Sequence, residues 1–226
     1  MNADHELSEV ALDPLAGDPR LPEVFGAAWP QIERFHRLLA EHGPIRGLIG
    51  PREVARLWER HLLNSASVVP HLGSARSLLD LGSGAGLPGV VIGLMEPGLK
   101  VTLLEPMARR VDWLTFLIEE LDLRNVRVVR GRAEDMAGTV RVAVVTARAV
   151  APLDKLYGWA APLVLESGLL LALKGSRAVD EVSAAASAAR RVGWTDVEIV
   201  ESGLLEGLEP TNIVRAVRTG GAQHVR

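Results

Sequence analysis

The chain of 226 residues contains no cysteine, and this absence excludes disulfides and thiolate metal sites. Its six histidines form no H-E-x-x-H pair, so we expect no bound metal. A G-x-S-x-G nucleophile elbow is also missing, because Leu81 stands two residues before Ser83, the serine of the most glycine-rich stretch. Neither zinc-dependent hydrolysis nor serine-elbow chemistry is therefore expected.

Long apolar runs are absent as well. No stretch is long enough to span a bilayer, and residues 1–18 are acidic and lack the basic start of a secretory signal. We expect a cytoplasmic protein with no membrane partner. With 48% hydrophobic and 23% charged residues, the chain suits one sizeable core plus an extension.

Lysine is scarce. Only Lys100, Lys155 and Lys174 are lysines among 25 basic residues, and the net charge is −3. This charge argues against a general nucleic-acid binder. The arginine fork nevertheless suits phosphates and guanine edges, although a GC-rich genome also favours arginine codons. The arginines around residues 109–110, 124–132 and 190–191 therefore indicate either an RNA surface or solvated faces.

The most informative stretch that is present runs from residue 78 to residue 89 and reads LLDLGSGAGLPG. A buried strand ends at Leu81, glycines follow at every second position, and a helix begins near Pro88. Glycine permits φ > 0 and a close approach of the backbone to a ligand, and free N–H groups at a helix start can face that ligand. In a parallel sheet this first turn lies where nucleotide-like ligands bind.

Two ligand classes fit this loop. Gly84, Gly86 and Gly89 form the G-x-G-x-x-G pattern of NAD(P) or FAD sites. The longer pattern Asp-x-Gly-x-Gly-x-Gly, which begins at Asp80 and Gly82, resembles the first motif of class I S-adenosylmethionine-dependent methyltransferases. A glycine-rich turn without a ligand is the third interpretation. We favour the methyltransferase.

A second acid supports a ligand that contains a ribose. Glu105 ends the next apolar run, about 20 residues beyond the loop, where an acid can accept both ribose hydroxyls. Dinucleotide-binding folds and methyltransferases share this feature. The alternative is an ordinary acid that caps the following helix.

The residue pattern divides the chain into three parts. Residues 1–20 are polar and contain prolines, and we expect a poorly ordered tail. Residues 21–74 predict a helical extension, with helices over 21–42 and 51–69. Residues 75–226 predict the catalytic domain, in which strands and helices alternate.

The alternating part predicts an α/β fold with a doubly wound, mostly parallel, seven-stranded sheet. Strands are expected at residues 77–81, 100–105, 126–130, 142–147, 168–173, 197–201 and 212–217. Helices are expected at residues 88–95, 108–121, 152–165 and 179–192. A short glycine-rich connection makes the last two strands candidates for an antiparallel pair.

Several segments match one family in order and spacing. They are ERHLLNS at 59–65, DLGSGAGLPG at 80–89, LLEP at 103–106, RRV at 109–111, GRAED at 131–135, ARAVAPL at 147–153 and ALKG at 172–175. On these segments the chain resembles the bacterial small-subunit rRNA guanine-N7 methyltransferases, historically called the glucose-inhibited division protein B family. The glycine loop is generic, whereas the Arg-His, Leu-Pro-Gly and Arg-Ala-x-Ala-x-Leu segments are specific.

The resemblance implies a Rossmann-like class I methyltransferase fold with S-adenosylmethionine as methyl donor and S-adenosylhomocysteine as product. It implies one guanine of 16S rRNA, within the small ribosomal subunit or its precursor, as acceptor. The implied cofactor contacts are Asp80, Gly82, Gly84, Gly86, Leu87, Glu105, Ala133, Glu134 and Arg148. Candidate RNA contacts are Arg60, His61, Arg109, Arg110, Arg132, Arg148 and Lys174.

Guanine N7 carries a lone pair in the neutral base, so methylation there requires no general base. Catalysis then rests on positioning and electrostatics, and Arg148 and Lys174 are the positioning candidates. A structural ion pair is the alternative for Arg148, and a helix-capping acid is the alternative for Glu134.

The chain departs from the family pattern at two places in the helical extension. Gly47-Leu48-Ile49 stands where the family often has Asn-Leu-Thr, and Asn64 stands where it often has Asp. We expect these departures to affect RNA or structural roles and not cofactor binding.

Other functions remain open at the level of sequence. One is a class I methyltransferase with a protein or small-molecule acceptor. Another is a non-catalytic cofactor-binding protein that associates with ribosomes, and a third is an NAD(P) oxidoreductase. We expect a monomeric or weakly associating protein.

Overall fold

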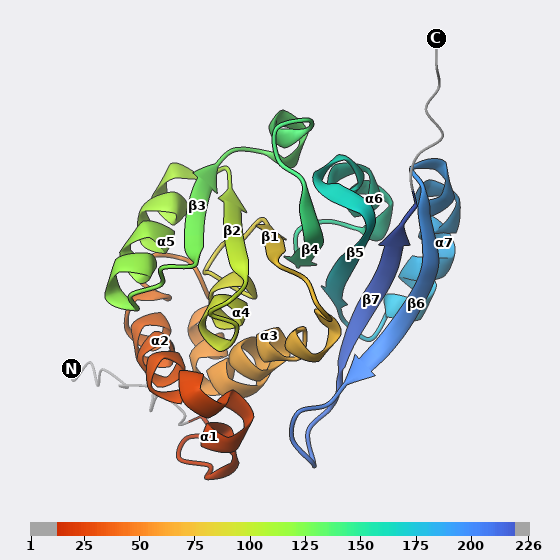
Figure 1. The fold of residues 1–226 in the computed structure, drawn as a ribbon. Coiled ribbons are helices and arrows are strands. Elements are labelled where there is room, and N and C mark those ends of the chain that lie inside the picture. The colour runs from red at the N-terminus through yellow and green to blue at the C-terminus, as the bar shows by residue number, and fades with distance from the viewer. Residues whose placement is uncertain (1–12, 220–226) are drawn as a thin grey trace, which may run out of the picture.

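Seven strands in the order β3-β2-β1-β4-β5-β7-β6 form the sheet of the computed structural model, which describes residues 13–219 (Figure 1). The strands are β1 (Ser77–Leu81), β2 (Lys100–Glu105), β3 (Val126–Arg130), β4 (Val142–Arg148), β5 (Val164–Lys174), β6 (Trp194–Ser202) and β7 (Thr211–Arg218). Strands β1 to β5 are parallel, and β7 lies antiparallel between β5 and β6. The predicted doubly wound, mostly parallel sheet is confirmed, as is the antiparallel pair.

Alternate strand residues face two separate cores. Leu78 and Leu103 pack with helices α4 (Gly89–Met95) and α5 (Ala108–Glu120) on one face. Leu79 and Leu104 pack on the other face with α6 (Leu153–Ala160) and α7 (Ala178–Arg191). Successive side chains of a strand point to opposite faces, so strands covered on both sides read as nearly continuous apolar runs. That physical rule explains why the strands could be located from the sequence.

The helical segment before the sheet shares the first of these cores. It comprises α1 (Arg20–Phe25), α2 (Trp29–His42), a 3₁₀ helix over Pro51–Arg56, a π-helix over Trp58–Leu63, and α3 (Asn64–Ala66). The expected helix over 21–42 is divided at Gly26, whose φ is 52°. The helix expected over 51–69 is present as an irregular helical segment, which winds as 3₁₀ and π turns over residues 51–63.

Side-chain hydrogen bonds compete with a regular helix in this segment. Asp13 Oδ2 accepts a bond of 2.9 Å from the N–H of Trp58. The hydroxyl of Ser65 donates to the carbonyl oxygen of His61 at 2.6 Å. The hydrophobic pattern in the sequence carries no sign of these polar contacts.

The expected poorly ordered tail covers residues 1–20, of which residues 1–12 lie outside the described part. For residues 13–20 the expectation is wrong. Asp13 also accepts a bond of 3.0 Å from the N–H of Leu15, and the Leu15 side chain is buried in the first core. One carboxylate that satisfies two backbone donors holds this polar, proline-containing stretch against the fold.

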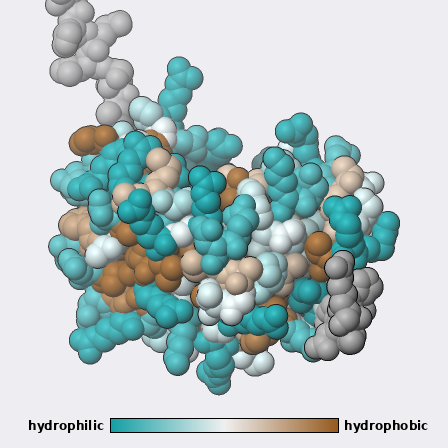
Figure 2. Space-filling model, turned by 90° about the horizontal axis from the view of Figure 1, so that it is seen from above, coloured by the Kyte–Doolittle hydropathy of each residue, from teal (hydrophilic) through white to brown (hydrophobic). Residues whose placement is uncertain are grey.

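Hydrophilic side chains cover most of the face seen in Figure 2, where hydrophobic residues form separate patches. The large hydrophobic side chains exposed in the described structure are Ile45, Met107, Leu165 and Val179. Within residues 13–219, no helix combines the length and the apolar character that crossing a membrane requires.

Candidate active site

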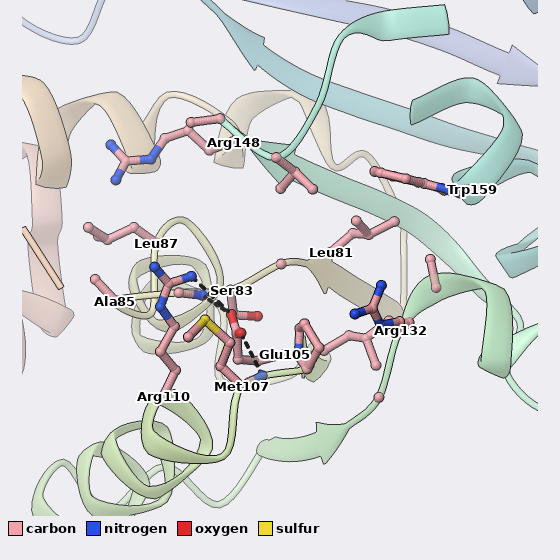
Figure 3. A pocket seen from close by; sticks show the side chains of 18 of the residues that line it. Leu81, Ser83, Ala85, Leu87, Glu105, Met107, Arg110, Arg132, Arg148 and Trp159 are labelled. Carbon is pink, nitrogen blue, oxygen red and sulfur yellow. Dashed lines mark hydrogen bonds and ion pairs between the residues drawn. The ribbon is translucent and has the colours of Figure 1, made fainter. Parts of the chain in front are cut away.

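A cavity of about 420 Å³ lies at the carboxyl ends of the parallel strands (Figure 3). Its walls are formed by strand ends and the loops that follow them: residues 81–85 and 87 at β1, 104–107 at β2, 131–134 after β3 and 148–150 at β4, with Leu48, Arg110 and Trp159. Small-molecule sites commonly have about 300–1,000 Å³. The position is the one that a doubly wound sheet offers to ligands.

The loop after β1 approaches its neighbours too closely for side chains. Gly82, Gly84 and Gly86 have φ of 74°, 53° and 100°, in the left-handed region that favours glycine. A Cβ on Gly82 would lie 2.7 Å from a methyl carbon of Val150, and one on Gly86 would lie 2.8 Å from a methyl carbon of Val90. Bare backbone therefore forms this wall of the cavity.

Asp80 lies beneath the loop and outside the lining of the cavity. It is 1% exposed, and its Oδ2 accepts a bond of 3.0 Å from the N–H of Gly89. The hydroxyl of Ser83 donates to the Asp80 carbonyl oxygen at 3.0 Å. Burial raises the pKa of Asp80 to about 7. Asp80 thus ties the end of β1 to the start of α4.

Glu105 presents a fixed carboxylate to the cavity. Its side chain is 2% exposed, its Oε2 accepts from the N–H of Gly84 at 3.0 Å, and its Oε1 accepts from the N–H of Met107 at 3.0 Å. Arg110 Nη1 lies 3.8 Å from Oε2, and Figure 3 shows these contacts as dashed lines. A carboxylate oriented in this way retains lone pairs for a pair of hydroxyl groups.

Arg148 lies across the cavity from Glu105 (Figure 3). Its Nη1 donates to the carbonyl oxygen of Arg60 at 3.0 Å, and its Nη2 lies 3.0 Å from Nδ1 of His61. Because a guanidinium only donates, Nδ1 accepts this bond and the imidazole proton is on Nε2, which donates to Glu53 Oε2 at 3.1 Å. Glu53, His61 and Arg148 form one connected chain, the Glu53–His61–Arg148 chain.

Both basic groups in this chain are perturbed. Burial, followed by the nearby Arg148 charge, lowers the pKa of His61 to about 4. Burial also lowers the pKa of Arg148 to about 10. At neutral pH the imidazole is therefore neutral and the guanidinium is charged, as the hydrogen bonds between them require.

Comparison with known proteins decides the family. The family model described as rRNA small subunit methyltransferase G matches residues 28–204. The chain belongs to this family. A ribosomal RNA small subunit methyltransferase G of Bifidobacterium longum is 44% identical over 214 residues, which are 89% of this chain and 97% of that protein. One of Thermobifida fusca is 51% identical over 163 residues, 72% of this chain and 69% of that protein. The family and the enzyme class predicted from the sequence, a methyltransferase, are confirmed.

Solved structures show the same architecture at low identity. The S-adenosylmethionine-dependent methyltransferase SibL, in its apo form, aligns with a TM-score of 0.62 and 19% identity over 92% of this chain and 72% of that chain. An S-adenosylmethionine-dependent O-methyltransferase from Thermotoga maritima aligns with a TM-score of 0.58 and 13% identity over 75% and 71%. These alignments establish the class I methyltransferase fold of this member of the methyltransferase G family.

The family assignment selects between the two ligand classes that the glycine loop left open, and the start of α4 agrees with that choice. A dinucleotide fold binds pyrophosphate with the free N–H groups at the start of the helix after β1. Here the N–H of Gly89, the first residue of α4, is bonded to the buried Asp80 carboxylate. The first N–H of α4 is thus used internally, whereas the backbone wall and Glu105 remain available to a ligand that contains a ribose.

The cofactor residues expected from the family resemblance converge, with two exceptions. Those that line the cavity are Gly82, Gly84, Leu87, Glu105, Ala133, Glu134 and Arg148. Asp80 lies beneath the loop, and Gly86 lies within it but packs against Val90 and does not line the cavity. Glu105 accepts from the N–H of Met107 just before α5, as the alternative of a helix-capping acid expects. The same carboxylate also accepts from the N–H of Gly84 in the glycine loop.

The residues expected to contact RNA do not form one surface. Arg110, Arg132 and Arg148 line the cavity, whereas Arg109 is exposed on α5. His61 is 9% exposed and, with the Arg60 carbonyl, supports Arg148 from behind. The side chain of Arg60 is exposed, pairs with Glu53 at 3.2 Å and does not line the cavity.

Lys174 does not reach the cavity. Its side chain is 12% exposed, and its Nζ donates to Glu181 Oε1 at 2.8 Å and to the carbonyl oxygen of Ala151 at 2.9 Å. It connects β5 with α7 and with the loop after β4. Of the two positioning candidates, the structure brings only Arg148 to the site.

Both departures from the family pattern lie next to the site. Leu48 lines the cavity, whereas the expectation that these departures leave cofactor binding unaffected stays a prediction. Asn64 Oδ1 lies 3.4 Å from Arg148 Nη1, and its Nδ2 donates to the Thr211 hydroxyl at 3.1 Å. Trp159 of α6 and Met107 also line the cavity and were missed, because neither belongs to a recognisable motif.

Proposed function

We propose that this protein transfers the methyl group of S-adenosylmethionine to N7 of one guanine in 16S rRNA of the small ribosomal subunit. The single observation that carries the proposal is the buried Glu105 carboxylate, held by the glycine loop at the wall of a 420 Å³ cavity. The names of the relatives support the rRNA acceptor. The specific motifs around Arg148 support guanine N7.

The cavity residues divide the work of holding the cofactor. Glu105 accepts hydrogen bonds from the two ribose hydroxyls. The backbone at Gly82 and Gly84, with Leu87, holds the methionine part, and the backbone of Ala133 with Glu134 borders the adenine. When bound, S-adenosylmethionine supplies an electrophilic methyl group on a sulfonium.

No residue of the site has to remove a proton. The lone pair of guanine N7 is available in the neutral base, and the only imidazole near Arg148 within the described structure, His61, already accepts a bond from it. The task left to the protein is to bring N7 into line with the methyl group. Leu81, Leu87 and Trp159 add apolar surface to the lining of the cavity.

Arg148 is the residue that orients the acceptor. A guanidinium has five N–H donors, and the contacts to Arg60 and His61 use only part of this capacity. The remaining donors suit guanine O6 or a flanking phosphate. They do not suit N7 itself, because the methylated base becomes cationic and a cation at N7 would raise the barrier.

The position of N7 sets the form of the substrate. N7 lies in the major groove, which in A-form RNA is too deep and narrow for side chains to read. The target guanine is therefore unpaired or is extruded into the cavity. We infer that a shaped ribosomal site, and not a short naked hairpin, is the good substrate.

The test is the partition of labelled methyl groups. Small subunits that lack the modification are incubated with the protein and labelled S-adenosylmethionine, and label is counted in rRNA, ribosomal proteins and small molecules. The proposal expects label in rRNA alone. Label in proteins, or cofactor binding without any transfer, would favour the protein acceptor or the non-catalytic alternative.

A further inference from the structure

A second hollow, of about 470 Å³, lies at the amino ends of the parallel strands. Its lining includes the first residues of β1 to β4, which are Ser77, Lys100, Val126 and Val142. Because the strands are parallel, their amino ends all lie at one end of the sheet, and the cavity lies at the other end, where the strands finish. Strands of five to six residues place the two ends of the sheet about 17–20 Å apart along the strand direction.

All titratable side chains that line this hollow are basic. Lys100, Arg124, Arg127 and Arg141 line it, no aspartate or glutamate does, and all four cations are exposed. In a chain of net charge −3, this is a local reversal of sign. We call this hollow, with the four cations that line it, the amino-end groove.

Two of the four cations are already restrained by neighbours. Arg127 Nε donates to the Thr102 hydroxyl at 3.1 Å, and Arg124 pairs with Asp122 at 3.2 Å. Among the ion pairs of residues 13–219, none involves Lys100 or Arg141. The groove therefore has charge that the described protein does not neutralise.

The groove stands on a fixed base. Val101, Val126 and Val142 beneath it are 1%, 7% and 5% exposed. The two N–H donors of Asn125 Nδ2 are shared among the carbonyl oxygens of Gly93, Glu96 and Leu99, which lie 3.0, 3.1 and 3.0 Å away, and these contacts hold the turn between Arg124 and Arg127. A rigid base fixes the spacing of the backbone positions from which the four cations extend.

We propose that the amino-end groove binds the phosphodiester backbone of the rRNA substrate at a second point, remote from the reacting guanine. The identity of the RNA rests on the proposed function. Arginine forks and a lysine ammonium suit phosphate oxygens, and phosphate contacts fix orientation without reading sequence. Contacts at the cavity and at the amino-end groove, at opposite ends of the strands, let a protein of negative net charge hold a folded polyanion in one orientation.

The test removes the two cations that have no ion pair. For Arg190 and Arg191 the structure favours the solvated-face alternative, because both are exposed at the end of α7 and line neither the cavity nor the groove. The K100Q/R141Q double variant is therefore compared with R190Q/R191Q, which removes the same charge outside the groove. Binding to protein-free 16S rRNA is measured over a range of salt concentrations, and methyl transfer is measured on small subunits. Thermal unfolding and S-adenosylmethionine affinity of both variants confirm that the fold is intact.

We expect the slope of log affinity for 16S rRNA against log salt to become shallower by about 1.5 in K100Q/R141Q, at about 0.7–0.9 for each lost phosphate contact. The KM for small subunits rises about tenfold, with kcat and cofactor affinity unchanged. R190Q/R191Q retains the wild-type values. Equal behaviour of the two double variants overturns the proposal.

Two further outcomes separate this proposal from its alternatives. If K100Q/R141Q binds intact subunits weakly but protein-free 16S rRNA normally, the groove contacts a ribosomal protein and the proposal is overturned. If the wild-type protein binds rRNA with the expected salt slope but transfers no methyl group, the groove stands and the proposed function fails.

Discussion

Arg148 and His61 are 87 residues apart in the sequence, yet Nη2 of the guanidinium lies 3.0 Å from Nδ1 of the imidazole. This contact joins the end of β4 to the helical segment that precedes the sheet. It also determines the tautomer of His61, because the proton on Nε2 is donated to Glu53. The helical segment thus positions the residue to which we assign orientation of the acceptor.

His61→Ala tests this contact. Removal of the imidazole leaves the half-buried Arg148 without one acceptor, which costs about 1–3 kcal/mol of unfolding free energy. We expect kcat/KM for small subunits to fall by a larger factor than S-adenosylmethionine affinity. Denaturant unfolding, calorimetry and methyl-transfer kinetics measure the three quantities.

The matched control is His61→Gln, whose amide can accept from Arg148 and donate to Glu53. It is expected to recover part of both stability and kcat/KM. Wild-type kinetics in His61→Ala would show that Arg148 needs no support from the helical segment.

Glu105→Gln tests the ribose contact. A neutral amide loses the ionised acceptor, and a hydrogen bond to a charged group contributes about 1.5–3 kcal/mol, so we expect cofactor affinity to fall about 10- to 150-fold. Calorimetry with S-adenosylmethionine measures this loss. Glu198→Gln, which removes an exposed pair with Arg215 on the last two strands, is the control and should bind normally. Equal affinity in Glu105→Gln and Glu198→Gln would remove Glu105 from the site.

Gly82→Ala tests the backbone wall. The new Cβ would lie 2.7 Å from Val150, and the φ of 74° disfavours any side chain, so cofactor binding should be abolished. Gly158→Ala on α6 is the matched control, because nothing lies within 4 Å of its Cβ. It should bind normally and gain up to about 1 kcal/mol of stability. Persistent binding in Gly82→Ala would contradict the assignment of the loop.

Asp80 makes stability depend on pH. Its pKa is about 7 in the folded protein and near 3.8 in the unfolded chain, so the folded state holds the proton more tightly. This contribution is complete below pH 3.8 and is lost as the pH rises through 7. Relative to Asp80→Asn, the wild type should lose up to about 4 kcal/mol between pH 4 and pH 8, at about 1.36 kcal/mol per pKa unit.

Denaturant unfolding of both proteins at several pH values measures this difference, since other titrating groups are common to the two. Asp80→Asn keeps an oxygen that can accept from the N–H of Gly89. A constant difference across the pH range would show that Asp80 stays ionised in the folded protein.

The sheet, the glycine loop and Glu105 could be predicted because their signals are local. Strands buried on both faces are apolar throughout, and the loop needs glycine at left-handed positions such as Gly82. His61 is different, because its sequence neighbours do not show whether it faces RNA or a buried guanidinium contributed by β4. The packing of Asp13 and the place of Leu48 in the cavity wall likewise depend on partners distant in the chain.

The central claim is tested most directly by nucleoside analysis of 16S rRNA. Small subunits that lack the modification are incubated with the protein and labelled S-adenosylmethionine, and the labelled nucleoside is identified and its position mapped by reverse transcription. The account predicts N7-methylguanine at one position, and a strongly reduced yield with Glu105→Gln at the same cofactor concentration. Label on another base or atom, or an equal yield with Glu105→Gln, would contradict it.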